Sequence, residues 1–216
     1  MTTLKAGRRW LLAIAFGYAS LQAWVLSGQS LHLIWQGPGA FSPPFGPKYA
    51  GEWPWVVGHA VSACLLLSLG PLLLARWQFP LARGRHARLG KLYLGCAAVA
   101  IFTGLPLSSR AEGGLGATLS FYTLSAWWAW ATWRAYQTAR SRQWAKHQLW
   151  VRFHYALAFS AVWLRIGLGT AAYLDLEVEQ VAGGLAWASW QPAMIYAWKG
   201  GLLSERKQPA VVEPAV

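Results

Sequence analysis

The chain has 216 residues, of which 56% are hydrophobic and only 12% are charged, and its formal net charge is +12. About a quarter of the residues of a soluble domain are charged, so this composition argues against a soluble protein and favours a chain in contact with lipid. Its basic residues lie between apolar stretches and not along one helix face, which argues against a nucleic-acid partner.

The apolar stretches predict an all-α, polytopic membrane protein, a bundle of six transmembrane helices forming a single domain over residues 1–207. The first stretch follows a basic N-terminus, but it is too long for a signal peptide, and we expect it to remain as a span. A segment rich in Gly and Pro over 36–54 interrupts helical structure, and a disordered tail is expected over 208–216. The spans are predicted over 10–30, 55–77, 89–108, 116–136, 151–173 and 183–200.

The basic residues of the connections predict the orientation. Under a six-span model, Lys48 and Arg110 fall on one side of the membrane, and all other Lys and Arg residues of the connections fall on the opposite side. Lys and Arg collect in cytoplasmic connections, so both termini are predicted to lie in the cytoplasm (N-in/C-in). The partner that this arrangement requires is the lipid bilayer.

Ionisable residues within membrane spans are costly and often functional. The predicted spans contain no Asp or Glu, which argues against a carboxylate proton relay and a catalytic carboxylate pair. Cys64 and Cys96 are expected to be small buried residues, because neither belongs to a metal or redox motif. No catalytic residue is indicated, and whether the chain is an enzyme stays open.

Histidines and one deep arginine lie at two predicted depths. His147 and His154 are seven residues apart, so one helix face would hold both, about 10 Å apart along the axis. The cytoplasmic level contains His86, His147 and His154, and the outer level contains His32, His59 and Arg165.

Two neutral imidazoles at one depth on facing helices are what an axially ligated haem requires, and helical bundles build cofactor sites in this way. The layout favours an inner haem b between His86 and either His147 or His154, and an outer one between His59 and His32. Arg165 would then neutralise a propionate. The 16 Trp residues fit interfacial belts or stacking on a flat cofactor.

This layout predicts a small b-type electron-transfer subunit, with His59, His86 and His147 as iron ligands. Two alternatives stay open. The chain is also consistent with a binder or transporter of a small anionic or amphipathic molecule, with His59 and Arg165 lining an outward pocket. The third alternative is a structural or assembly subunit that works with other membrane or redox subunits.

Several segments together resemble the DUF2306 family of predicted bacterial membrane proteins, namely GHAVSACLLLSLGPLLLARWQF, RHARLGKLYLG, KHQLWVRFHYALAFSAVWLR and LAWASWQP. The resemblance implies a multi-pass protein of the bacterial inner membrane, without assigning a reaction. It singles out His59, His86, His147 and Arg165, whereas His154 is not a family position. The chain departs from the family pattern at Ala87, where the family has Arg, at Val151, where it has Met, and at Ala193, where it has Asn.

Overall fold

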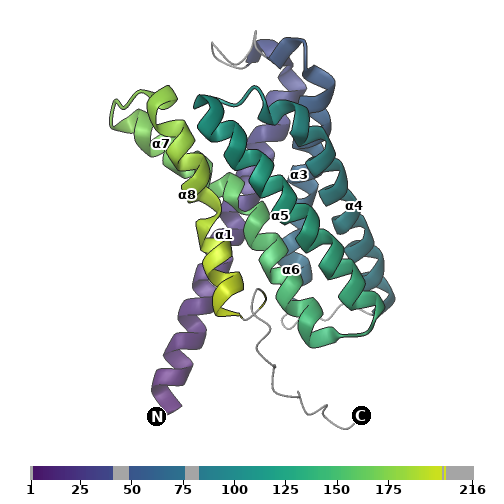
Figure 1. Cartoon of the computed structure of the whole chain (residues 1–216). Coiled ribbons are helices and arrows are strands. Elements are labelled where there is room, and N and C mark those ends of the chain that lie inside the picture. Colours follow the sequence, from purple (N-terminus) through teal and green to yellow (C-terminus); the bar gives the residue numbers. More distant parts are fainter. Residues whose placement is uncertain (1, 41–48, 76–82, 201, 203–216) are drawn as a thin grey trace. The chain divides into compact units, whose positions relative to one another are not determined.

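The computed structural model describes residues 2–40, 49–75, 83–200 and 202, and all regular secondary structure in them is helical (Figure 1). This confirms the predicted all-α class. Contacts divide the chain into two compact units, residues 1–96 and 97–216, and each is considered by itself. The single domain over 1–207 stays a prediction, and the predicted disordered tail falls outside the described residues.

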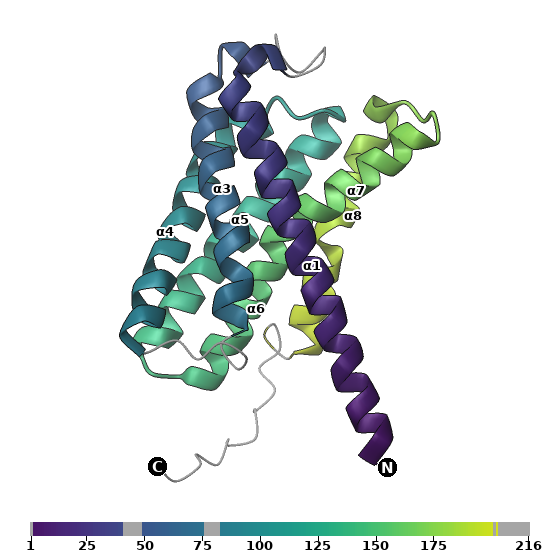
Figure 2. The same ribbon diagram turned by 180° about the vertical axis from the view of Figure 1, so that it is seen from behind.

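The first unit is built on two antiparallel helices, α1 (Thr2–Gln36) and α3 (Trp53–Leu74), which lie side by side in Figure 2. Gly37 follows α1 with φ of +85°, a conformation that glycine adopts without steric cost, and the 3₁₀ turn η1 (Pro38–Ala40) comes next. Pro54 stands in the first turn of α3, where its missing N–H has no helical partner to lose. The predicted break is thus confirmed at both of its described ends.

Polar side chains join α1 to the backbone of α3. The Trp24 indole Nε1 donates to the Ser68 carbonyl at 3.2 Å. The Ser27 hydroxyl donates to the Ala23 carbonyl at 2.8 Å within α1, and its oxygen also lies 3.4 Å from the Cys64 carbonyl on α3. The Cys64 thiol donates in turn to the Ser27 carbonyl at 3.6 Å, and its side chain is buried, as is that of Cys96. The prediction that both cysteines are small buried residues is therefore confirmed. In a membrane, such bonds and close packing hold helices together.

Helix α4 (Arg83–Ser108) runs from the first unit into the second. It begins six residues before the apolar stretch predicted over 89–108. Three of the six added residues are Arg, which is a good helix former although it is not apolar. Apolarity therefore located this helix but set its start too late.

The second unit contains α5 (Gly114–Arg140), α6 (Trp144–Ala158), α7 (Ser160–Tyr173) and α8 (Val178–Lys199). In this unit α5 packs against both α6 and α8, and α7 packs against α8 (Figure 1). Small side chains let helix backbones approach closely. Such residues make up most of the buried faces of α5 and α8, namely Ala117, Ser120, Ala131, Ala135 and Thr138 on α5 and Ala182, Ala186, Ser189, Ala193 and Ala197 on α8.

The stretch predicted as one span over 151–173 is two helices, α6 and α7, separated at Phe159. The Val162 N–H donates to the Phe159 carbonyl at 3.0 Å, which is the tighter i to i+3 pattern of a 3₁₀ turn. Neither Pro nor Gly stands at this break, so residue type gave no signal for it.

Among the described residues, three segments are long and apolar enough to cross a membrane: Trp53–Leu74, Gly84–Ser108 and Trp144–Tyr173. They correspond to the second, third and fifth predicted spans. The third of these segments includes the break at Phe159 and is 30 residues long.

Two helices end in a left-handed residue that is not glycine, Arg142 after α5 and Asp175 after α7. After α5, the Gln143 N–H donates to the Thr138 carbonyl at 2.9 Å, and the Arg142 N–H donates to the Ala139 carbonyl at 3.1 Å. This pair of bonds is a Schellman motif, in which the left-handed position favours glycine.

We expect Arg142→Gly to raise the free energy of unfolding by about 1 kcal/mol, because glycine removes the steric cost of the left-handed conformation. Asp175→Gly should give a smaller gain, since Asp tolerates that conformation better than Arg does. The thermal unfolding midpoint of detergent-purified protein measures both. A lower midpoint for Arg142→Gly would mean that its side chain stabilises the fold in another way.

Candidate functional site

His147 lies in the first turn of α6 and is half-buried. Its Nδ1 lies 2.9 Å from the carbonyl oxygen of Ala135 on α5. A carbonyl oxygen can only accept, so the Nδ1 of His147 has the proton and donates it. In the neutral ring, the Nε2 atom is then the nitrogen with the lone pair.

His154 lies seven residues further along α6, and its side chain is completely buried. Its Nε2 lies 3.1 Å from the hydroxyl oxygen of Thr132, and that hydroxyl donates its single proton to the Trp128 carbonyl at 2.8 Å. Nε2 of His154 is therefore the donor in this pair. The Trp128 ring covers the imidazole, with 5.7 Å between the ring centroids.

Both histidines contact α5, so the prediction that the seven-residue spacing puts them on one helix face is confirmed. Their environments differ. His147 is half-buried near the basic end of the helices, and its Nδ1 bonds to backbone. His154 bonds through Nε2 to a side chain inside the unit.

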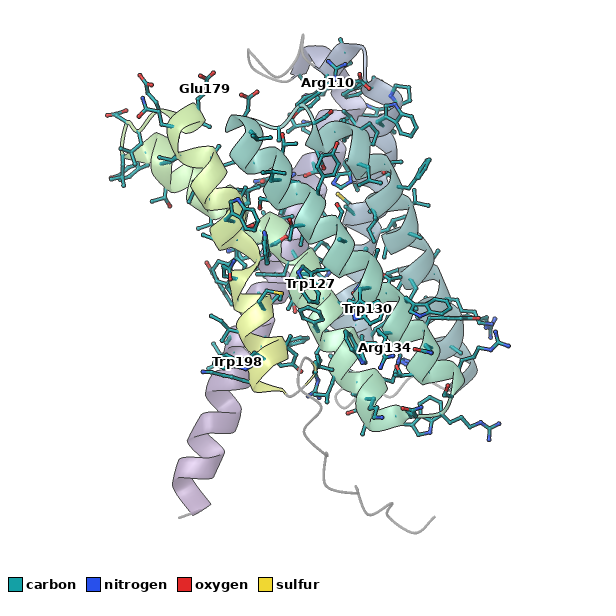
Figure 3. The ribbon with its side chains drawn as sticks, in the orientation of Figure 1. Arg110, Trp127, Trp130, Arg134, Glu179 and Trp198 are labelled. Atoms are coloured by element: carbon teal, nitrogen blue, oxygen red, sulfur yellow. The ribbon has the colours of Figure 1, made fainter. Side chains whose placement is uncertain are left out.

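Arg134 on α5 makes cation–π contacts with two tryptophan rings, one of which, Trp130, is labelled beside it in Figure 3. Its guanidinium carbon is 5.7 Å from the centroid of Trp130 and 5.3 Å from that of Trp150, and its Nη1 donates to the Gln137 amide oxygen at 3.1 Å. The Nε atom is buried and has no hydrogen-bond acceptor among the described residues.

Sequence reasoning missed Arg134 as a site residue, because it counted only as an orienting charge of the cytoplasmic connection. One signal was present in the sequence. Trp130 stands four residues before Arg134, which puts the two on the same face of a helix. The contact with Trp150 depends on how α5 and α6 pack, so residue spacing could not indicate it.

The outer pair predicted from the sequence lies in the first unit, on α1 and α3. Trp24 on α1 bonds to Ser68 on α3, and Ser27 is paired with Cys64, so the two helices are antiparallel. Continuing this pairing along the helices puts His32 level with His59. His32 is exposed in the last turn of α1, where its Nε2 lies 3.2 Å from the Gln36 amide nitrogen. His59 is half-buried, and its backbone carbonyl accepts from the Ser62 hydroxyl at 3.1 Å.

The remaining predicted residues are His86, half-buried at the start of α4 in the first unit, and Arg165, exposed on α7 in the second. The inner haem pair was predicted to join His86 to a histidine of the second unit, and it stays a prediction. Among the described residues, no group of three or more His, Cys, Asp or Glu residues could hold a metal ion.

Comparison with protein families gives one match. The model of DUF2306, described as a predicted membrane protein, matches residues 56–199, from the first turn of α3 to the end of α8. No curated protein and no solved structure matches the chain.

Proposed function

We propose that this chain, which belongs to the DUF2306 family of predicted membrane proteins, crosses the bacterial inner membrane six times with both termini in the cytoplasm. Three segments already have the length and apolarity of spans. The proposal adds α1, α5 and α8, with 35, 27 and 22 residues, because about 20 helical residues cross the hydrocarbon core. The one-sided distribution of Lys and Arg supports the orientation.

We further propose that the protein is a small electron-transfer subunit that binds a b-type haem through His147. The observation that carries this proposal is the hydrogen bond from the His147 Nδ1 to the Ala135 carbonyl. Ligating histidines characteristically donate their other ring N–H to a carbonyl or carboxylate, which fixes the ring and directs Nε2 at the metal. A haem bound there would carry single electrons by cycling between ferric and ferrous iron.

Burial assigns the other histidine of α6 a different part. The Nε2 of His154 donates to Thr132, and the whole imidazole is enclosed inside the unit against Trp128, which suits packing and leaves no exposed ring edge for a haem. The proposal thus favours His147 over His154, the choice that the sequence left open. Lys146, the residue directly before His147, suits a propionate group of a haem.

An optical spectrum of detergent-purified, haem-supplied protein tests this assignment, recorded oxidised and after dithionite. We expect a Soret band that sharpens on reduction, that is lost in His147→Gly, and that returns when imidazole is added to that variant. His154→Gln should keep the band. His59→Ala and His86→Ala in the same series test the remaining ligands predicted from the sequence.

A flat spectrum of the unchanged protein contradicts haem binding. A band that survives His147→Gly but disappears in His154→Gln contradicts the assignment of the ligand.

One observation favours a second function, a binder or transporter of a small anionic molecule. Arg165 is exposed on α7, within a segment long and apolar enough to cross a membrane, and α7 contains no acidic residue. Cations at membrane depth often mark a path for anions. The spectrum separates the two functions, because this one requires no haem band.

A further inference from the structure

Arg134 has a partly buried charge that the described residues of the second unit do not neutralise. Its contacts are two tryptophan faces and the Gln137 amide, and no carboxylate lies within ion-pair distance among the described residues. A cation removed from water loses hydration that aromatic faces restore only in part. The buried Nε, which lacks an acceptor in the described part of the chain, increases this deficit.

The acidic residues that the structure describes in this unit lie at the opposite end of the helices. Glu112 precedes α5, and α5 rises by about 1.5 Å per residue, which puts Arg134 about 30 Å along the axis from the start of α5. Figure 3 shows the same separation, with Glu179 at one end and Arg134 towards the other. Asp175 and Glu177 lie in the connection before α8, next to Glu179. An anion at Arg134 therefore comes from outside the described residues.

The position of Arg134 suits a lipid head group, an inference that rests on the proposed topology in which α5 crosses the membrane. It stands six residues before the end of α5, or about 9 Å along the axis, which is where the acyl chains of a leaflet meet its phosphates. Trp133 and Tyr136 are exposed beside it, as expected for aromatic residues at a membrane interface. Lys146 adds exposed positive charge at this end.

We propose that Arg134, held between Trp130 and Trp150, binds the phosphate of an anionic phospholipid. The planar guanidinium donates from its two Nη atoms to two phosphate oxygens, an end-on form of the paired contact in which arginine recognises phosphate. The buried Trp150 packs against the guanidinium from inside the unit, and the exposed Trp130 lies against the first part of the acyl chains. Free inorganic phosphate offers the same oxygens, so the test includes it.

Native mass spectrometry of the full-length protein in mild detergent measures the binding of phosphatidylglycerol, phosphatidylcholine and inorganic phosphate. We expect Arg134→Gln to weaken phosphatidylglycerol binding about ten-fold or more, the effect of losing a charge-assisted bidentate contact. Arg134→Lys keeps the charge but not the paired donors, so its affinity for phosphatidylglycerol should lie between those of the unchanged protein and Arg134→Gln. Arg140→Gln removes the same charge from an exposed position on α5 and should have little effect.

Equal losses in Arg134→Gln and Arg140→Gln would overturn the proposal, because they would indicate unspecific attraction to the basic end. Binding of inorganic phosphate that depends on Arg134, without a preference for phosphatidylglycerol, would overturn the lipid as occupant. Unchanged binding in both Arg134 variants would exclude the site. Thermal unfolding midpoints of all variants identify any that fail to fold, and Arg134→Lys then provides the comparison.

Discussion

A single methyl group added at Gly113 is expected to destabilise the second unit by about 2–4 kcal/mol. Gly113 precedes α5 with φ of +92°, a conformation that costs other residues free energy. A Cβ atom at this position would lie 2.4 Å from the backbone nitrogen of Gly183 on α8 and 2.9 Å from the carbonyl carbon of Ala182. These backbone atoms cannot rotate away as the end of a flexible side chain can, so α5 and α8 must move apart to make room for the Cβ atom.

The neighbouring glycine provides a matched control. Gly114 also has a positive φ, +62°, but a Cβ there would meet nothing within 4 Å. Gly114→Ala should therefore cost only the free energy of placing alanine in a left-handed conformation, about 1 kcal/mol. Gly113→Ala has that cost and also the steric clash of the new Cβ atom with α8. Thermal unfolding followed by circular dichroism compares the two variants. Equal losses would show that the close approach of α5 and α8 adds nothing to stability.

Gly113 also shows what a sequence predicts about a turn. Its position between two apolar stretches indicated a turn, because glycine there is typical of one. The partner across the turn, Gly183, lies seventy residues later on α8, and only the packing of α5 on α8 brings the two together. The Gly and Ala residues on both helices permit this approach, but many pairs of small residues in the chain could have met.

Hydropathy located the helices well, because apolarity is summed over many residues and single exceptions matter little. All six predicted spans fall largely on helices. The ends were less well predicted, as at Arg83, where helix propensity carries α4 beyond the apolar stretch. The break at Phe159 has no signal in residue type, since it depends on the local packing of α6 and α7.

For the candidate site, helix periodicity predicted only which residues share one face of a helix. The seven-residue spacing put His147 and His154 on one face, which their contacts with α5 confirm. Which ring nitrogen each uses follows from the acceptor that α5 offers, a carbonyl at Ala135 and a hydroxyl at Thr132. That depends on the register between two helices, which spacing within one helix does not determine.

Thr132→Val is expected to lower the free energy of unfolding of the second unit by about 1–2 kcal/mol. Valine fills nearly the same volume but cannot accept the proton of the His154 Nε2. His154 has no exposed surface, so water cannot replace the lost acceptor without disturbing the packing. Thr132→Ser keeps the hydroxyl and should recover most of the loss, although it removes a methyl group.

Thr123 is the matched control for this change. It lies on the same helix, and its hydroxyl also donates to the carbonyl four residues before it, Leu119 at 2.8 Å, but this hydrogen bond is exposed and no histidine bonds to the hydroxyl among the described residues. Thr123→Val should therefore change the unfolding midpoint little. A similar loss in both variants would trace the effect to the bond within α5 and not to His154.

A double-mutant cycle isolates the bond between the two helices. His154→Phe alone removes the donor and keeps a ring against Trp128, and combining it with Thr132→Val leaves neither a donor nor an acceptor in the core. Replacing both partners of a buried hydrogen bond costs less than the sum of the single replacements. We expect the double variant to be more stable than the two single losses predict, by about 1 kcal/mol. Strict additivity would mean that Thr132 and His154 act independently. The His154 imidazole would then be oriented by its packing against Trp128, and the hydroxyl of Thr132 would serve only the backbone of α5.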